Sequence, residues 1–246
     1  MRRELKILGL TLALSPVVIW GPRALDVMAA LETFRISASE IEVTGVLQYI
    51  TPESVIEQMD LGQFASVWGD RETWAERLST HPLILEADVR RRLPNGLRVT
   101  IVERRPVGMA PTPTLEPVDA EGFRLPIDPT VHRMDLPIIT SEHYPEAEAA
   151  VFPDEVRNLA VELEALTLAD GKFVQNVSSI ERAADGSLRV HLIKPPVEFL
   201  IPEGTPVVRL REAQTALRHA MSQNPGHVPA VIDLRFSGQV VVRRVR

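Results

Sequence analysis

The amino-acid sequence predicts an α+β protein with an N-terminal membrane-anchor helix, a small β-α-α-β-β domain, and a larger mixed β-sheet domain with two helices. Three observations predict this class. Residues 7–20 carry no charge and follow a short basic segment. Residues 34–104 contain two capped helical patterns and then two runs of alternating apolar and polar residues. Residues 105–246 contain two longer helical patterns among several short alternating runs.

Composition sets limits on the chemistry. The chain has 246 residues with 45% hydrophobic content, which is enough to build ordinary cores. Its formal net charge of -6 disfavours general nucleic-acid binding, because a phosphate-binding surface needs an excess of basic residues. The absence of cysteine excludes disulfides, thiolate nucleophiles and cysteine-ligated zinc sites. Stability must therefore come from packed cores.

The N-terminus has the pattern of a membrane-targeting segment. Three basic residues in "MRRELK" precede Ile7–Trp20, fourteen residues without a charge. At ~1.5 Å per residue this run covers only ~21 Å of a hydrocarbon layer ~30 Å thick, which by itself favours a cleaved signal peptide. A membrane-spanning helix needs a longer usable span.

The flanking residues supply that length. If Lys6 and Arg23 extend their charged ends toward the interfaces, the usable span is longer, and Trp20 falls at an interfacial position. We therefore predict a cytoplasmic tail at 1–5 and an uncleaved anchor at 6–25, with the rest of the chain exported.

The small domain is predicted to follow a linker at 26–33. Its first strand is expected over Phe34–Val43. Thr51 and Asp70 are good N-caps for the two helices that follow. The residues that recur on the buried faces of these helices are Val55, Ile56 and Met59 in the first and Trp74 and Leu78 in the second.

A hairpin completes the small domain. Gly96 is expected to take a left-handed conformation in its turn. The inward-facing positions are expected to be Leu85, Ala87, Val89, Leu97, Val99 and Ile101. The arginines fall mostly on the other face or at strand ends: Arg90, Arg92 and Arg98 with Glu86, Asp88 and Glu103 as counter-charges, and Arg104 and Arg105 at the joint between domains. This pattern fits a solvated sheet face or a docking face.

The secondary structure of the larger domain is predicted from its turn residues and from the spacing of its apolar residues. Asp119 and Gly122 predict a turn between two short strands. One helix is expected from Pro153 to just before Gly171, and a second is expected to be capped by Thr205. The remaining predicted strands are Val177–Arg182, Leu188–Ile193, Val197–Ile201 and two C-terminal strands that form a tight hairpin, the last over Gln239–Val245.

Several stretches carry a family resemblance. They are "IEVTG" (Ile41–Gly45), "HPLILEADVRRRLPNGLRVTIVERRPV" (His81–Val107), "VDAEGFRLP" (Val118–Pro126) and "IDLRFSGQVVV" (Ile232–Val242). With the basic N-terminus and single anchor, their order resembles the FtsQ/DivIB family of bacterial cell-division proteins. The resemblance implies a POTRA domain over 34–104 and an FtsQ-type β domain over 105–246.

The family resemblance also implies a function. It implies a non-catalytic, single-pass scaffold of the divisome in the inner membrane, with its C-terminal domains periplasmic, that links early and late division proteins at the septum. The implied partners are FtsB and FtsL, with FtsK and FtsW as further divisome partners, and no cofactor is implied.

The C-terminal hairpin is the candidate partner-binding site. A final strand is often a sheet edge, and an edge offers unpaired N–H and C=O groups to an extended partner. In the family, the corresponding hairpin docks the periplasmic segment of FtsB, and Arg235 would pair with a partner carboxylate. The implied partner-binding residues are Arg235, Phe236, Ser237, Gly238, Gln239, Val240, Val241 and Val242. The alternative is an ordinary closing hairpin in which Phe236 belongs to the core.

Other functions have weaker support. The six histidines occur with no pair at a metal-ligand spacing, and the chain has no G-x-S-x-G, Walker or G-x-G-x-x-G motif. We therefore predict no metal, no cofactor and no enzyme activity. Two alternatives stay open: a POTRA-containing component of outer-membrane assembly or secretion, which typically leads into a β-barrel longer than this chain allows, and an exported hydrolase with an unfamiliar site.

Overall fold

The computed structural model describes residues 31–112, 114–141 and 149–243. The chain divides into two compact units, Met1–Glu103 (unit 1) and Arg104–Arg246 (unit 2), where the sequence placed a boundary between 104 and 105. The predicted tail at 1–5 and the predicted anchor at 6–25 lie outside the described residues, as does most of the linker. No helix within the described ranges is long and apolar enough to cross a bilayer.

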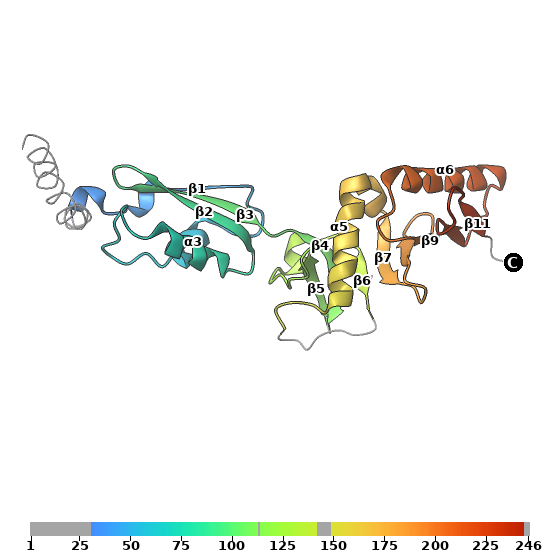
Figure 1. The fold of residues 1–246 in the computed structure, drawn as a ribbon, viewed down its shortest axis with the longest axis horizontal. Helices are drawn as coiled ribbons and strands as arrows, with labels where there is room; N and C mark the ends of the chain where they lie inside the picture. The colour runs from blue at the N-terminus through green and yellow to red at the C-terminus, as the bar shows by residue number, and fades with distance from the viewer. Residues whose placement is uncertain (1–30, 113, 142–148, 244–246) are drawn as a thin grey trace, which may run out of the picture. The chain divides into compact units, whose positions relative to one another are not determined.

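Unit 1 is a three-stranded sheet with helices on one face (Figure 1). Its strands are β1 (Ile41–Thr44), β2 (Ile84–Arg92) and β3 (Gly96–Glu103), in the order β1-β3-β2. The central β3 pairs parallel with β1 and antiparallel with β2. The helices are α2 (Pro52–Gln58) and α3 (Arg71–Ser79). The predicted β-α-α-β-β order is therefore confirmed.

The helix caps of unit 1 follow their residue chemistry. The Thr51 hydroxyl accepts a hydrogen bond from the Ser54 amide at 3.2 Å, and the Asp70 carboxylate accepts from the Glu72 and Thr73 amides. The Thr73 hydroxyl also donates to the Asp70 carboxylate at 2.8 Å, and this hydrogen bond is the main reason that the pKa of Asp70 is lowered. The core between helices and sheet contains Val55, Met59, Trp74, Leu78, Ile84, Val89, Leu97, Val99 and Ile101.

The first predicted strand was too long. Residues before Ile41 form two 3-10 turns, Glu32–Phe34 and Ala38–Glu40, and β1 has only four residues. The segment is instead joined to the α2–α3 loop by an isolated bridge between Arg35 and Ser66. Apolar residues in this segment therefore pack against the core without a continuous ladder.

Gly96 does not have the left-handed conformation predicted for it, since it is not among the residues with positive φ. It begins β3 opposite Arg92, and a Cβ there would lie 2.6 Å from the Glu40 carbonyl oxygen. The glycine is needed for this close backbone approach rather than for a positive φ. A bulge between Ile84 and Glu86 also leaves Leu85 exposed, where the alternation had placed it in the core.

The outward arginines of unit 1 are paired with carboxylates. Arg90 bonds Asp88 at 2.6 Å, and Arg98 bonds Glu42 across the strands at 3.1 Å. The sequence suggested that Glu103 is also a counter-charge to these arginines, but it is not. Its carboxylate is buried and accepts three backbone amides in the β1–α2 loop, from Gln48, Tyr49 and Ile50, at 2.7–2.8 Å. Glu103 therefore fixes that loop.

Unit 2 is an eight-stranded sheet in the order β11-β10-β9-β8-β7-β6-β4-β5. The strands are β4 (Pro106–Thr112), β5 (Thr114–Asp119), β6 (Ile138–Thr140), β7 (Val177–Arg182), β8 (Leu188–Leu192), β9 (Glu198–Ile201), β10 (Val231–Asp233) and β11 (Val241–Arg243). Strands β4 and β6 were not predicted. The second short strand expected after Gly122 is present only as isolated bridges.

One face of this sheet is covered by α5 (Asp154–Val174) and α6 (Val207–Gln223), and a short α4 (Pro129–His132) lies in a connection (Figure 1). The register aligns one row of core residues across six strands: Ile139, Ile180, Val190, Phe199, Ile232 and Val242. Both helices contribute to the same core, through residues such as Leu163 and Leu210. The opposite face carries the alternate residues of each strand.

Two details of these helices differ from expectation. Helix α5 does not end at Gly171, because it continues through a kink at Asp170, whose side chain accepts from the Phe173 amide. Thr205 does not cap α6. Its hydroxyl donates to the Pro202 carbonyl at 2.6 Å, and Pro206 precedes the first turn.

A candidate partner-binding edge strand

Strand β11 is one edge of the eight-stranded sheet. It pairs antiparallel with β10, so that Val242 lies opposite Ile232 and Val241 opposite Asp233. Within the part of the chain that the structure describes, no strand lies on its other side. An edge of this kind presents backbone donors and acceptors to an added strand.

The opposite edge, β5, is partly closed. Pro117 in this strand has no amide to donate, and its carbonyl accepts from the Leu125 amide at 2.9 Å. The Asp119 amide donates to the Phe123 carbonyl at 3.1 Å. The Phe123–Leu125 segment therefore covers the C-terminal half of β5. The two edges of the sheet differ in how open they are to another polypeptide.

The turn before β11 is held by α6. Arg209 donates from one guanidinium nitrogen, Nη2, to the carbonyls of Phe236 at 3.0 Å and Gln239 at 2.8 Å. Its other terminal nitrogen bonds Glu212 at 2.7 Å. Gly238 has a φ of 73°, which a glycine adopts without strain. Arg209 thus fixes a loop about thirty residues away in the sequence. The helical pattern of apolar residues around Arg209 does not predict this contact.

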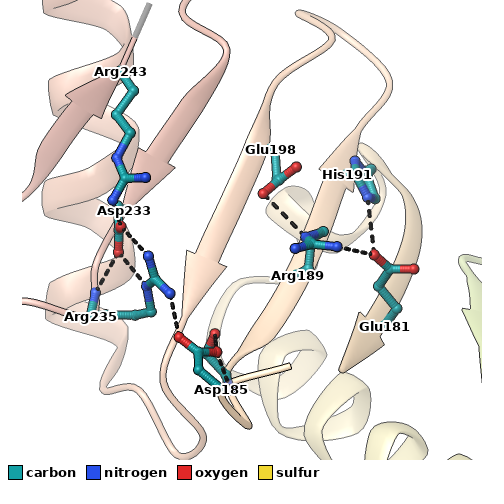
Figure 2. A network of polar contacts seen from close by, with 9 residues as sticks. Glu181, Asp185, Arg189, His191, Glu198, Asp233, Arg235 and Arg243 are labelled. Carbon is teal, nitrogen blue, oxygen red and sulfur yellow. Dashed lines mark hydrogen bonds and ion pairs between the residues drawn. The ribbon is translucent and has the colours of Figure 1, made fainter. Parts of the chain in front are cut away.

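The Arg235 guanidinium forms its ion pairs within its own chain (Figure 2). It holds Asp233 through Nε at 2.9 Å and Nη2 at 2.6 Å, and it also bonds Asp185 in the β7–β8 turn. The resemblance placed Arg235 to pair with a partner carboxylate, but two internal carboxylates already occupy its guanidinium. Its contacts join the C-terminal hairpin to the β7–β8 hairpin.

Asp233 is the centre of this network. Its side chain is fully buried and also accepts from Arg243 of β11 at 2.7 Å. The hydrogen bonds from Arg235 are the main reason that the pKa of Asp233 is lowered. The pKa of Asp185 is lowered to about 2, first by Ser187 and then by Arg235. Both carboxylates are therefore ionised at neutral pH, and Asp233 ties β11 to β10.

The other implied site residues differ in exposure. Phe236 is 42% exposed and so does not belong to the core. Ser237, Gly238 and Gln239 are exposed in the turn. Val240 and Val242 pack against the core from its rim, and Val241 lies on the other face of the sheet. The exposed apolar surface beside β11 is therefore Phe236 with part of Val241.

A second charged cluster lies on the same face of the sheet (Figure 2). Arg189 of β8 bonds Glu181 of β7 at 2.8 Å and Glu198 of β9 at 3.2 Å. His191 lies 3.9 Å from Glu181. The carboxylates raise the pKa of Arg189, Glu181 most strongly. In the described part of the chain, no three acidic or histidine side chains are placed to hold a metal ion.

Comparisons with known proteins agree with this architecture. Residues 36–104 match the POTRA domain of the FtsQ type. The chain is 30% identical to the cell division protein FtsQ of Rhodothermus marinus, over 69% of this chain and 63% of that protein. It is 28% identical to FtsQ of Myxococcus fulvus, over 68% of this chain and 66% of the relative. A third relative, FtsQ of Salinibacter ruber, is 23% identical over 98% of this chain and 94% of its own length.

Proposed function

Because the chain belongs to the FtsQ/DivIB family of cell-division proteins, we propose that it is a non-catalytic, single-pass scaffold of the bacterial divisome. In this proposal β11 accepts an extended segment of an FtsB-type protein, which arrives with an FtsL-type protein. The scaffold links early and late division proteins at the septum, and FtsK and FtsW are further candidate partners. The predicted anchor at 6–25 holds the chain in the inner membrane, with both units on the outer side.

The open edge of β11 is the observation that carries the proposal. Strand addition needs a row of unpaired backbone groups at a sheet edge, and β11 pairs only with β10 among the described strands. The other edge of the same sheet is covered by Phe123–Leu125 over its C-terminal half and interrupted by Pro117. Strand addition is therefore favoured at β11 over β5.

Side chains beside the edge set the chemistry of the partner. Phe236 and Val241 offer apolar surface, and the Arg243 side chain is half exposed, with one bond to Asp233. A partner strand with an apolar side chain and a carboxylate on the same face fits this arrangement. Arg235 then acts as a positioning residue, since its guanidinium is held by Asp233 and Asp185.

Co-purification tests the proposal. We expect the full chain to retain an FtsB-type membrane protein and to lose it when Gln239–Arg246 are deleted. Leu115→Lys on β5 is the matched control, because this side chain is 45% exposed at the opposite edge and its change should leave binding intact. Retained binding after the deletion would contradict the proposal. Turnover of cell-wall substrates by a 26–246 fragment would contradict the non-catalytic part.

A further inference from the structure

Two loops of unit 1 are joined to the segment with which the described chain begins. The Ile36 amide donates to the Ala65 carbonyl at 2.8 Å, which fixes the α2–α3 loop. The Ser37 amide donates to the Asn95 carbonyl at 3.2 Å, which fixes the β2–β3 turn. Figure 1 shows this turn at the end of unit 1 where the described chain starts. We call residues 31–36, 61–66 and 92–95 the N-terminal surface.

Large apolar side chains are exposed on all three parts of the N-terminal surface. Leu31 is 50% exposed, Phe64 is 69% exposed and Leu93 is 59% exposed. The α2–α3 loop has no charged residue from Leu61 to Gly69, although 24% of the whole chain is charged. Exposed apolar side chains gathered on loop tips are typical of a surface that meets another apolar phase.

Arginines accompany these apolar side chains. The Arg35 guanidinium lies 5.0 Å from the centre of the Phe64 ring, and its side chain is 42% exposed. Arg92 is 53% exposed next to Leu93. The nearby carboxylates Glu32 and Glu40 are each 3.9–4.0 Å from one of these arginines, and Asp60 lies 3.8 Å from Arg77. Segments that lie in the membrane interface combine arginine or lysine with phenylalanine, tryptophan or leucine in this way.

The position of this surface in the chain favours the membrane as the phase that it meets. Leu31 follows Leu25, the last residue of the predicted anchor, by six residues. Six extended residues reach at most about 21 Å, so an inserted anchor keeps Leu31, where the N-terminal surface begins, within that distance of the bilayer. A tether this short gives a millimolar local concentration, at which weak interfacial contacts are populated.

We propose that the N-terminal surface rests on the outer face of the membrane, with Phe64 and Leu93 in the interfacial region and Arg35 beside the phosphates of anionic lipids. The inference rests on the anchor in the proposed function and not on the β11 edge. It assigns unit 1 a lipid contact that orients this unit at the membrane surface.

The absence of cysteine permits a direct test. Phe64→Cys and Leu93→Cys in the full chain are labelled with a polarity-sensitive fluorophore. The labelled chains are reconstituted in phosphatidylethanolamine and phosphatidylglycerol vesicles, with or without lipids brominated near the headgroup. Val46→Cys is the matched control, because this residue is 74% exposed but lies past the far end of β1, in the loop held by Glu103.

We expect brominated lipids to quench the labels at 64 and 93 but not the label at 46. Adding Arg35→Glu should reduce the quenching at 64. The inference is overturned if the label at 64 behaves like that at 46, or if its emission shifts to the blue without bromine quenching, which indicates contact with protein. Vesicle flotation and partner co-purification separate this result from the proposed function. If the chain floats and binds its partner, only the lipid contact fails; if it does not float, the anchor and this inference fail together.

Discussion

Asp233→Asn should loosen β11 without unfolding the rest of the chain. In the native protein, Asp233 Oδ1 accepts from the amide and Nε of Arg235, and Oδ2 accepts from Nη2 of Arg235 and Nη2 of Arg243. An asparagine amide supplies only one acceptor oxygen. Its NH2 group must face two donors whichever way the side chain is turned.

The expected cost follows from those contacts. A hydrogen bond to a charged group contributes about 1.5–3 kcal/mol, and either orientation of the amide loses two of them. Arg235 is 29% exposed and Arg243 is 50% exposed, so both can be partly resolvated when they leave the site. About 2–3 kcal/mol of local stability should be lost, which corresponds to roughly 30- to 150-fold faster hydrogen exchange in β10 and β11.

Amide hydrogen exchange measures this opening directly. The three tryptophans, Trp20, Trp68 and Trp74, all precede unit 2, so the denaturation midpoint followed by tryptophan fluorescence should stay unchanged and serves as an internal control. Asp185→Asn, which removes a half-exposed carboxylate, should have a smaller effect. Unchanged exchange in β11, or a shifted tryptophan transition, would refute the reasoning.

Three further changes test other contacts. Arg209→Ala should accelerate exchange in the turn before β11 and weaken partner binding, while Arg211→Ala on the same helix should not; equal effects would contradict the proposed clamp. Thr51→Ala should cost about 1 kcal/mol of unit 1 stability in denaturation followed by tryptophan fluorescence, Thr51→Ser should restore it, and no loss would contradict the cap. The pKa of Asp185 is lowered from 3.8 to about 2, so its stabilisation is present above pH 3.8 and is lost as the pH falls toward 2. Asp185→Asn should flatten this part of the stability profile, and an unchanged acid limb would argue against it.

Local chemistry was a reliable guide where one residue type determines the backbone. Strand β7 has the predicted bounds, and Thr51 and Asp70 cap their helices. Gly186 supplies the positive φ that the short turn between β7 and β8 requires. Asp119 accepts from the amides of Glu121 and Phe123, as its turn requires. These features depend on contacts within a few residues, which a sequence pattern displays.

The missed elements depend on tertiary contacts. Strand β4 contains Pro106 and Pro111, which usually argue against a strand, and β6 has only three residues. The kink in α5 persists because Asp170 accepts from the Phe173 amide and starts the helix again beyond it. A glycine next to such a residue does not end the helix.

The candidate site could be predicted only in part from the sequence, because it too depends on tertiary contacts. A terminal strand suggested an edge, and the sheet order places β11 there. The bond between Arg235 and Asp185 joins residues fifty positions apart, and Arg209 reaches its loop from another element. No local pattern distinguishes an arginine held by its own chain from one that is available to a partner.

Hydrogen exchange of β11 in the free chain and in its complex with an FtsB-type protein tests the central claim most directly. The account predicts that amides of Val241–Arg243 exchange more slowly in the complex, because an added strand bonds the edge that β10 leaves open. Unchanged exchange at β11, with new protection at β5 or only in unit 1, would contradict it.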